Sequence, residues 1–462
     1  MSQVVVGVDF GSSRIKAAAF TRDGEMVAVG AVNTPLVRAS AGDDFPVLEM
    51  LDAARHVVAA LDVDDIAALG MTSMGEVGTI LTHDGLAPIA FPSWYDDRGD
   101  EVVHALERGW GARRLRDLTA RHLRTTSTVA KLAHVQATTS GVPAGRFVGL
   151  CGALAHQLTG QTWQEAGLAV TSGVYDLVER RYLSDVWASA GLAHVGLVDI
   201  RPPGRGAPAQ GDLARALKLT PGAPVIIAGH DHPVAAVGSG VRVGEAFDSL
   251  GTGEAIIAPF SRDAGVERGD LVAHLDRDPD LTFEVWPSTG APLVVWERMR
   301  PGLAMRTFLD ASALDRGALE DGALPPGDRP SFSPDDLAAL QSGRLAPGRY
   351  DAPAWGDLID AYVLLASQGD RLVREVSGAR GATIVTGGGL RSRRWRGSKL
   401  ALHPGPLEVS TVTEAAARGC AAIAGVSAGW WSRPENMPGT TRIPVSTPAE
   451  MDAALEGPAS PR

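Results

Sequence analysis

The sequence predicts a mixed α/β protein made of two similar halves with a central cleft. The chain has 462 residues, which exceeds what one hydrophobic core usually serves. Residues 4–9 form an apolar run that ends in an acid and a glycine-containing turn, and residues 15–20 return as a second apolar run. Residues 245–258 repeat this order of strand, acid, Gly/Ser/Thr turn and strand. The repeat indicates an internal duplication, with one strand–turn–strand motif opening each half.

The composition is that of a globular protein, with 45% hydrophobic residues. The net charge is -11 with both signs interspersed, which argues against a nucleic-acid partner but permits small anionic ligands at a local site. Cys151 and Cys420 lie among small apolar residues, as expected for core positions in a reducing compartment. No apolar stretch is long enough to span a bilayer. We therefore expect a cytoplasmic protein without a membrane partner.

The first half opens with a meander of three strands. The β-branched and alternating runs predict strands at residues 4–8, 15–20 and 26–32, with a hairpin turn at Asp23-Gly24. An amphipathic helix over 48–61 and a strand over 66–72 follow. The region 100–158 is mostly helical in pattern, with turns at Gly109, Gly111 and 140–141.

The second half contains a long segment, 310–353, that is rich in Pro, Gly and Asp and that we predict to be a surface excursion. An amphipathic helix is predicted over 358–376, and a strand over 383–386 runs into three glycines. Ser392 begins a helix that ends at Leu402, and residues 412–428 form a helix of small residues. The last six residues have no periodicity and two prolines, which predicts a frayed end.

Residues 226–233 form the segment on which the site prediction depends most. Three apolar residues lead into Gly229, the acid Asp231 follows, and Pro233 fits the first turn of a helix. The pattern predicts a buried strand that delivers one carboxylate to the start of a helix. Asp231 is therefore either a plain helix cap or an ionised general base, and both interpretations are compatible with this segment alone.

Three glycine-rich turns follow predicted buried strands. Glycine lets backbone N–H groups wrap an anion, and hydroxyl side chains add donors. The third turn also opens a helix, whose N-terminus attracts phosphate or lets a nucleotide lie on it. Neither a Walker-type loop nor a Gly-x-Gly-x-x-Gly motif after the first strand occurs. The turns are Gly11-Ser12-Ser13, Gly251-Thr252-Gly253 and Gly387-Gly388-Gly389, and acids (Asp9, Asp248) lie near the first two.

Two charged residues flank the first turn. Asp9, at the end of the first strand, is placed to hold Mg²⁺ through water, since that ion keeps much of its hydration. The alternative for Asp9 is an acid that only caps the turn. Lys16 is either a phosphate neighbour or a solvated strand residue.

A second group of residues suggests a sugar-binding surface. Trp94 offers a flat apolar face, Asp96 and Arg98 can hydrogen-bond hydroxyl groups, and Glu76 follows a predicted strand that ends nearby. A surface turn with an ion pair is the alternative. His230 and His232 have the spacing of two metal ligands on a strand, but no third ligand is evident in sequence, so structural or substrate-lining histidines are favoured over zinc.

Taken together these motifs resemble the FGGY family of carbohydrate kinases, including its xylulose and glycerol kinases, over most of the chain. The resemblance rests on Asp9-x-Gly11-Ser12-Ser13, Trp94-x-Asp96-x-Arg98, Gly229-His230-Asp231, Gly251-Thr252-Gly253, Gly387-Gly388-Gly389 and the helix from Glu414 through Gly419.

The resemblance implies a duplicated actin-like ATPase (ribonuclease H-like) fold. It implies an N-terminal domain over 1–240, a C-terminal domain over 241–440 and a tail over 441–462. It further implies that ATP and Mg²⁺ are cofactors, that Asp231 accepts the proton of the attacking hydroxyl, and that Glu76 and Asp96 lie in or near the sugar pocket. The phosphate loops would be those at Gly11 and Gly251, with adenosine at Gly387. A homodimer is possible by the same resemblance.

Several departures leave the acceptor open. Residues 72–78 lack the Gln-Met-His of xylulose kinases, Gly75 replaces the arginine before Glu76 that a glycerol kinase would show, and Leu400-Ala401 stands where Ala-Asp is common. The expected activity is phosphorylation of a hydroxyl of a small sugar, with a short-chain ketose favoured over a polyol such as glycerol or erythritol. The rivals are a non-catalytic actin-like nucleotide switch, which would not require Asp231 or the Trp94 motif, and a sugar-sensing regulator.

Overall fold

The computed structural model describes residues 3–39, 42–139, 141–251, 253–261, 267–322, 331–439 and 442–456. The described residues group into two compact units. Unit 1 draws on Met1–Gly238, Ala264–Pro292 and Glu414–Thr440, and unit 2 on Ser239–Asp263, Leu293–Thr413 and Thr441–Arg462. The prediction of domains over 1–240 and 241–440 did not include the two later segments that return to unit 1.

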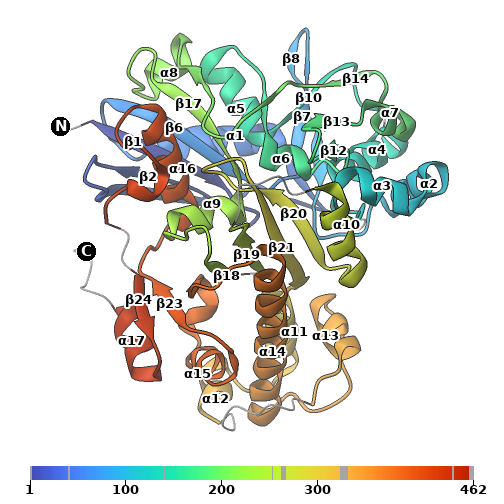
Figure 1. Ribbon diagram of the computed structural model, residues 1–462. Helices are drawn as coiled ribbons and strands as arrows, with labels where there is room; N and C mark the ends of the chain where they lie inside the picture. The colour runs from blue at the N-terminus through green and yellow to red at the C-terminus, as the bar shows by residue number, and fades with distance from the viewer. Residues whose placement is uncertain are drawn as a thin grey trace. The chain divides into compact units, whose positions relative to one another are not determined.

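The main sheet of unit 1 has the strand order β16-β17-β6-β1-β2-β3 (Figure 1). β1, β6 and β17 are parallel, while β2, β3 and β16 are antiparallel to their neighbours. The bounds are β1 Val4–Phe10, β2 Arg14–Phe20, β3 Met26–Asn33, β6 Ile66–Ser73, β16 Ala207–Pro208 and β17 Pro224–His230. The predicted opening meander and the fourth strand are confirmed.

Unit 2 repeats this topology. Its strands run in the order β21-β19-β18-β22-β23-β24. Here β18, β22 and β23 are parallel, and β19, β21 and β24 are antiparallel to their neighbours. The bounds are β18 Ala246–Leu250, β19 Glu254–Pro259, β21 Pro292–Met299, β22 Thr383–Thr386, β23 Leu407–Ser410 and β24 Arg442–Val445. β18 corresponds to β1 and β19 to β2, so the internal duplication predicted from the repeat is confirmed.

Smaller strands and the helices complete the two units. The further strands of unit 1 are β4 Val37–Ala39, β5 Gly42–Pro46, β7 Gly78–Thr82, β8 Gly85–Leu86, β9 Ala90–Pro92, β10 Gly145–Gly149, β11 Gln164–Glu165, β12 Tyr175–Asp176, β13 Arg181–Tyr182, β14 Val195–Leu197, β15 Ile200–Arg201 and β20 Leu281–Val285. Its helices are α1 Val47–Ala59, α2 Asp100–Trp110, α3 Ala112–Thr119, α4 Thr128–Thr138, α5 Leu150–Thr159, α6 Ala166–Val170, α7 Ser184–Trp187, η1 Ala188–Leu192, α8 Gly211–Ala216, α9 Asp231–Gly238, α10 Arg268–Arg277, α16 Ala415–Ser427 and η3 Pro434–Asn436. Those of unit 2 are α11 Pro301–Ala311, α12 Arg316–Asp321, α13 Pro334–Gln341, α14 Ala352–Ser377, η2 Gly388–Arg391, α15 Arg393–Leu402 and α17 Pro448–Glu456.

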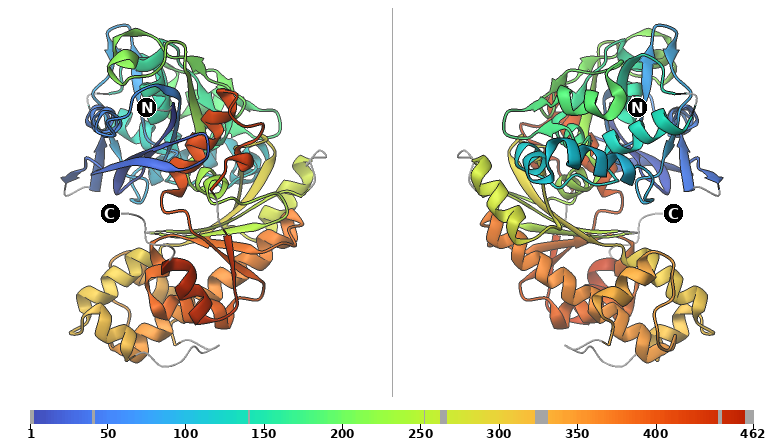
Figure 2. Two further views of the ribbon diagram at one scale, coloured as in Figure 1. Left: turned by 90° about the vertical axis from the view of Figure 1, so that its left-hand side faces the viewer. Right: turned by 90° about the vertical axis from the view of Figure 1, so that its right-hand side faces the viewer.

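The two faces of β1 serve two different cores because side chains alternate along a strand. Val4, Val6 and Val8 belong to the large core that includes α1 and α5. Val5 belongs to a smaller core with α16, and Gly7 and Asp9 share its face by the same alternation. Figures 1 and 2 show α16 beside the N-terminal strands, although hundreds of residues separate them in sequence.

Glycines allow α16 to lie directly on this sheet. A Cβ atom on Gly7 would lie 1.8 Å from the Ala417 carbonyl oxygen, and one on Gly70 would lie 2.2 Å from that of Cys420. On α9, a Cβ on Gly238 would lie 1.9 Å from the Ala415 oxygen. Only backbone without side chains fits at such distances, so the small-residue helix predicted over 412–428 packs backbone against backbone.

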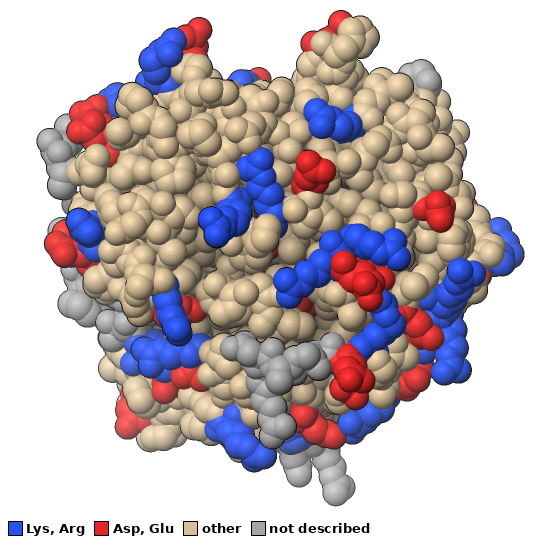
Figure 3. All heavy atoms as spheres, turned by 45° about the horizontal axis from the view of Figure 1, so that its top comes forward, with Lys and Arg blue, Asp and Glu red and all other residues tan. Residues whose placement is uncertain are grey.

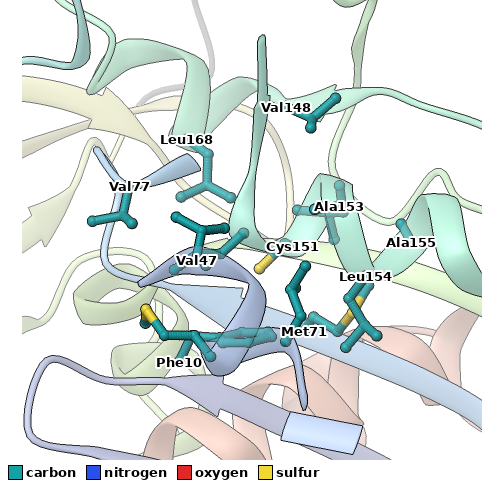
Figure 4. Packing of buried hydrophobic residues seen from close by; sticks show 14 of the residues in the cluster. Phe10, Val47, Met71, Val77, Val148, Cys151, Ala153, Leu154, Ala155 and Leu168 are labelled. Carbon is teal, nitrogen blue, oxygen red and sulfur yellow. The ribbon is translucent and has the colours of Figure 1, made fainter. Parts of the chain in front are cut away.

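Both cysteines are free and buried, as predicted. Cys151 projects from α5 into the large core, where Val47 and Met71 lie near it (Figure 4). Among the described residues no helix is long and apolar enough to cross a membrane. On the face shown in Figure 3, basic and acidic side chains are interspersed over a largely uncharged surface.

Two sequence predictions need correction. The region 100–158 is mostly helical, as predicted, and also contains the strand β10, but Gly109 lies inside α2 rather than in a turn; residue 140 lies outside the described residues. Segment 310–353 was predicted as a surface excursion, but its described part holds α12 and α13, which bury Leu319, Leu337 and Leu340. Local caps by Asp315 and Ser333 start these short helices, and hydrophobic periodicity does not detect such caps.

The C-terminal segment predicted as a tail is structured as far as residue 456. β24 pairs with β23, and α17 follows it with Met451 and Ala454 buried. The end predicted to fray, 457–462, lies outside the described residues.

Candidate active site

Three parallel strands of unit 1 bring Asp9 and Asp231 to the same end of the sheet. Asp9 at the end of β1 is paired with Thr72 of β6, and Thr72 is paired with Gly229 of β17. Asp231 follows two residues later as the first residue of α9. The carboxyl ends of parallel strands are the usual place for ligands in α/β folds, because loops and helix N-termini converge there.

A bulge in β17 sets the approach to Asp231. The pairing register shifts between Ile227 and Gly229, and Gly229 has φ 133°, a conformation that glycine accepts without strain. The Thr72 hydroxyl donates to the Gly229 carbonyl at 2.7 Å. A Cβ on Gly229 would lie 3.2 Å from Oε2 of Glu165, so the glycine also makes room for a buried acid.

The Asp231 carboxylate is held by one of its oxygens. Oδ1 accepts a hydrogen bond of 2.7 Å from the His232 backbone N–H and lies 3.2 Å from Nε2 of His230. Within the described chain, no hydrogen bond reaches Oδ2. About a quarter of the side chain, 26%, is exposed, so Oδ2 is accessible to a ligand. This geometry satisfies both interpretations from sequence, since Asp231 begins the helix and keeps one oxygen free.

Asp9 is an acid without an internal partner for one oxygen. Its Oδ1 is buried and makes no hydrogen bond with the described residues. Burial, together with the negative charges of Asp231 and Glu414, raises the pKa of Asp9 from 3.8 to about 7 against the opposing attraction of Lys16. An orphaned carboxylate oxygen near a second acid fits a hydrated divalent cation, which would satisfy that oxygen and remove the repulsion. The described residues contain no cluster of three or more His, Cys, Asp or Glu that could hold a metal ion, so such a cation would be held largely by water.

Lys16 lies beside Asp9 in the register of β1 and β2. Its Nζ donates to Oε2 of Glu414 at 2.8 Å, and both side chains are partly exposed. Lys16 is therefore an ion-paired residue rather than the solvated strand residue considered from sequence.

The first glycine turn is braced from β3. Thr34, just beyond that strand, donates from its hydroxyl to the Gly11 carbonyl at 2.6 Å and from its backbone N–H to the Ser13 carbonyl. The Ser12 and Ser13 side chains are partly or fully exposed. The turn thus presents donors while its carbonyls are occupied, as an anion-binding turn requires.

The Trp94 motif forms a network around a buried lysine. Asp96 accepts from Lys131 at 2.9 Å through Oδ1, and from Arg98 and Ser93 through Oδ2. Arg98 also contacts Asp44 at 2.7 Å, and Lys131 is completely buried. Burial alone would raise the pKa of Asp96, but the hydrogen bonds from Arg98 and Lys131 outweigh it and lower that pKa. Both Asp96 oxygens are therefore used inside unit 1.

Trp94 is partly buried against the large core of unit 1 and meets Tyr95 edge to face, with 5.5 Å between ring centroids. Glu76 is half-buried and close enough to raise the pKa of His230. The rings of His230 and His232 lie 6.0 Å apart and nearly perpendicular. Glu76, His230 and His232 thus belong to the Asp231 region.

The glycine turns of unit 2 pack on each other. A Cβ on Gly387 would lie 2.3 Å from the Leu250 carbonyl oxygen, and one on Gly389 would meet the Leu250 side chain at 2.9 Å. Gly388 has open space around it. The Gly251 N–H donates to the Gly253 carbonyl at 2.9 Å; Thr252 between them lies outside the described residues. The helix predicted after the third turn is confirmed, with Ser392 capping α15.

Asp248 does not flank the second turn in the way that Asp9 flanks the first, which corrects the sequence interpretation. Asp9 stands two residues before Gly11, whereas Asp248 stands three before Gly251. Because side chains alternate along a strand, Asp248 points to the opposite face, where it is buried and paired with Lys399. Glu254 lies 3.5 Å from the same lysine, and its pKa is raised well above 4.5 by burial and by Asp248.

Sequence analysis did not identify Glu284, Glu165, Lys131, Thr34 or Lys399. Glu284 lies on β20 and reaches His230 across 54 residues of sequence. Glu165 caps α6 through the Gly167 and Leu168 N–H groups, and burial raises its pKa to about 8. A buried acid in an apolar strand such as β20 was the available signal for Glu284, but it did not reveal the partner.

Comparisons with known proteins agree with this geometry. The model for the FGGY family of carbohydrate kinases, N-terminal domain, matches residues 4–238. An L-fuculokinase of Salmonella typhi is 27% identical over 266 residues, which cover 55% of this chain and 56% of that protein. A glycerol kinase of Rhizorhabdus wittichii is 26% identical over 474 residues, covering 94% of this chain and 90% of that protein.

Solved structures show the same fold. A xylulose kinase from Rhodospirillum rubrum superposes with a TM-score of 0.79 at 18% identity, covering 98% of this chain and 96% of that one. A Plasmodium falciparum glycerol kinase solved with ADP gives 0.74 at 12% identity, covering 96% of this chain and 94% of that one. The predicted fold, duplicated and actin-like, is confirmed.

Proposed function

The chain belongs to the FGGY family of carbohydrate kinases, and from that membership we propose that it transfers the terminal phosphoryl group of ATP to a hydroxyl of a small sugar. The favoured acceptor is a short-chain ketose. The observation that carries the proposal is the Asp231 carboxylate, whose Oδ1 accepts a hydrogen bond from the His232 N–H and lies 3.2 Å from Nε2 of His230, while no hydrogen bond from the described residues reaches Oδ2. A fixed carboxylate with one free oxygen suits a general base that accepts the proton of an attacking hydroxyl.

Phosphoryl transfer needs positioning and charge neutralisation more than covalent help from the protein. In the proposal, Glu76, His230 and His232 contact the acceptor and orient one hydroxyl toward Oδ2 of Asp231. Trp94 contributes an apolar face to the acceptor. Asp96 and Arg98 bind substrate less directly, because their charged groups are occupied by Lys131 and Asp44, and they hold the segment that carries Trp94.

ATP and Mg²⁺ are part of the proposal. Asp9 fits the ion because its buried Oδ1 has no hydrogen-bond partner among the described residues, and Mg²⁺, when bound, would neutralise charge on the phosphates. The turns Gly11-Ser12-Ser13 and Gly251-Thr252-Gly253 would donate N–H and hydroxyl groups to phosphate oxygens, with Lys16 beside the first. Gly387, Gly388 and Gly389 would form the surface for adenosine, since Gly388 has open space around it.

A polyol acceptor is the second candidate. It is favoured by the glycerol kinase relative, whose alignment spans 94% of this chain, whereas the L-fuculokinase alignment spans only 55% of it. A cytoplasmic location and a homodimer complete the proposal; the first is supported by two buried cysteines that form no disulfide.

The proposal is tested by measuring ADP release with ATP and Mg²⁺ against ketoses, aldoses and polyols. We expect one acceptor class to stimulate ADP release and Asp231→Asn to lower that kcat by at least about 100-fold, the usual contribution of a general base. Asp212→Asn on α8 is the matched control, because the Asp212 side chain is 96% exposed and is paired with Arg215 of the same helix. Slow hydrolysis that ignores every acceptor and survives Asp231→Asn would instead favour a nucleotide switch.

A further inference from the structure

His230 lies between two carboxylates. Its Nε2 is 3.2 Å from Oδ1 of Asp231, and its Nδ1 is 3.0 Å from Oε2 and 3.2 Å from Oε1 of Glu284. The exposed fractions of the His230 and Glu284 side chains are 11% and 1%. β17 and α9 supply the first two residues, and β20 of the same unit supplies the third.

The geometry requires a specific protonation state. An ionised carboxylate only accepts hydrogen bonds, and a neutral imidazole donates from only one nitrogen. Because Glu284 accepts from Nδ1, a neutral ring would leave Nε2 without a proton at 3.2 Å from the Oδ1 of Asp231. A lone pair facing a carboxylate oxygen is repelled, and a proton on Nε2 turns this contact into an attractive ion pair. His230 is therefore an imidazolium, and the three groups together carry one net negative charge instead of two.

We propose that Glu284 is a positioning residue that acts through His230, holding the imidazolium against Oδ1 of Asp231 so that Oδ2 is the oxygen that accepts the proton of the substrate hydroxyl. This inference rests on the proposed function, because it assigns a role in the same proton transfer. It extends that function by naming the basic oxygen and a residue, Glu284, that need not touch the substrate.

The surrounding charges support the imidazolium. Glu76 faces His230 from the loop after β6 and adds negative potential, while His232 and Arg121 lie on the Glu284 side. Glu165 is a further buried acid near Glu284. Burial alone would lower the pKa of His230, but Glu284 and Asp231 raise it well above 6.5. Burial would likewise raise the pKa of Glu284, but His230 and then Arg121 lower it below 4.5.

The alternative is an ion pair that only stabilises unit 1. Such a pair would affect unfolding but not the pH dependence of the reaction. A positioning role also predicts a change in the pH dependence, because the Asp231 carboxylate is easier to protonate when no cation lies beside it. The acid limb of the kcat profile then moves to higher pH, while the KM for the acceptor changes little.

The test combines a spectroscopic and a kinetic measurement on the full chain. Histidine labelled with ¹⁵N reports ring protonation, and the His230 signals are assigned by their loss in His230→Gln. In the wild type we expect both ring nitrogens to be protonated at pH 7 and above. In Glu284→Gln we expect a neutral ring at pH 7 and a kcat lowered about 10- to 100-fold, the factor that corresponds to losing one hydrogen bond between charged groups. Glu284→Asp, which keeps the charge, should restore the doubly protonated ring.

Asp176→Asn is the matched control, because Asp176 is a buried carboxylate of unit 1 whose partner is Arg268 at 2.8 Å. It should lower stability without moving the acid limb.

A neutral His230 ring in the wild type at pH 7 would overturn the inference whatever the activity. So would a Glu284→Gln profile that shifts no more than that of Asp176→Asn. If Glu284→Gln does not fold, Glu284→Asp and His230→Gln are compared with the wild type instead. A folded His230→Gln variant must then show the acid limb of its kcat profile at higher pH. A wild type that phosphorylates no acceptor would contradict the proposed function. The His230 ring signals do not depend on activity, so they test the present inference separately.

Discussion

Lys16 and Glu414 form an ion pair of 2.8 Å although they are 398 positions apart in sequence. Lys16 lies on β2 next to Asp9, and Glu414 precedes the first residue of α16. The pair joins the start of α16, a helix from the C-terminal part of the chain, to the N-terminal strands. It also places one positive and one negative charge beside the orphaned Asp9 carboxylate.

The first prediction separates the structural role of this pair from phosphate binding. Both side chains are about a quarter exposed, so the pair should contribute less than about 1 kcal/mol to stability. In the swap Lys16→Glu with Glu414→Lys, the ion pair is restored with its polarity reversed. We expect near-normal thermal stability but a higher KM for ATP, because the positive charge has moved away from the Gly11 turn. Normal ATP kinetics in the swapped variant would show that Lys16 is only structural.

The second prediction concerns the close packing of α16. Gly7→Ala places a Cβ 1.8 Å from a backbone oxygen of α16, and backbone cannot move aside as a flexible side chain can. We expect a loss of about 3 kcal/mol or more, the upper range for overpacking. Gly30→Ala on β3 of the same sheet is the control, since its Cβ would make ordinary contacts at 3.4 Å or more. It should change stability by less than about 1 kcal/mol. Urea unfolding compares the two, and equal losses would contradict the packing argument.

The third prediction is a pH dependence in unit 2. Asp370 is buried and accepts hydrogen bonds from Arg374 and Thr383. Burial raises its pKa, but His403 and Arg374 outweigh burial and lower it from 3.8 to about 2. A lowered acid pKa contributes stability that is present above 3.8 and lost as the pH falls through about 2. The shift corresponds to roughly 2 kcal/mol.

Asp370→Asn should therefore lower the melting temperature most at neutral pH, and the difference from the wild type should shrink between pH 4 and pH 2. Scanning calorimetry across this range measures the effect, with the exposed Asp212→Asn as the control. A difference that stays constant with pH would mean that the charge of Asp370 is not what stabilises the unit.

The fourth prediction concerns the buried lysine behind the Trp94 motif. Lys131→Met removes the bonds to the Asp96 carboxylate and to the Asp96 and Arg98 carbonyls. We expect a loss of about 3 kcal/mol, as is typical when one partner of a buried pair is removed, together with a higher KM for the acceptor and a kcat that falls less. Lys218→Met, which removes an exposed ion pair with Asp64, should leave both unchanged. An unaltered KM in Lys131→Met would remove the Trp94 segment from acceptor binding.

The part of the fold and site that the sequence predicted depends on local patterns. The alternating apolar runs predicted β1, β2, β3 and β6, and Gly229, Asp231 and Pro233 predicted the end of a strand and the start of a helix. These signals work because side-chain period, turn glycines and proline act within a few residues. The position of Asp248 also follows from a local pattern. It lies three residues before Gly251, whereas Asp9 lies two before Gly11, so the alternation of side chains places the two acids on opposite faces. The sequence interpretation did not use this spacing.

What only the tertiary structure decided is which charged groups meet. Glu284 reaches His230 over 54 residues, Lys131 reaches Asp96 over 35, and Lys16 reaches Glu414 over 398. The pairing partner of a charged residue is set by strand order and by the return of a segment to an earlier sheet, and neither leaves a periodic trace in the sequence. The sequence by itself therefore determined the fold class and the candidate base, whereas the protonation state of His230 and the free oxygen of Asp231 depend on contacts that exist only once distant segments pack together.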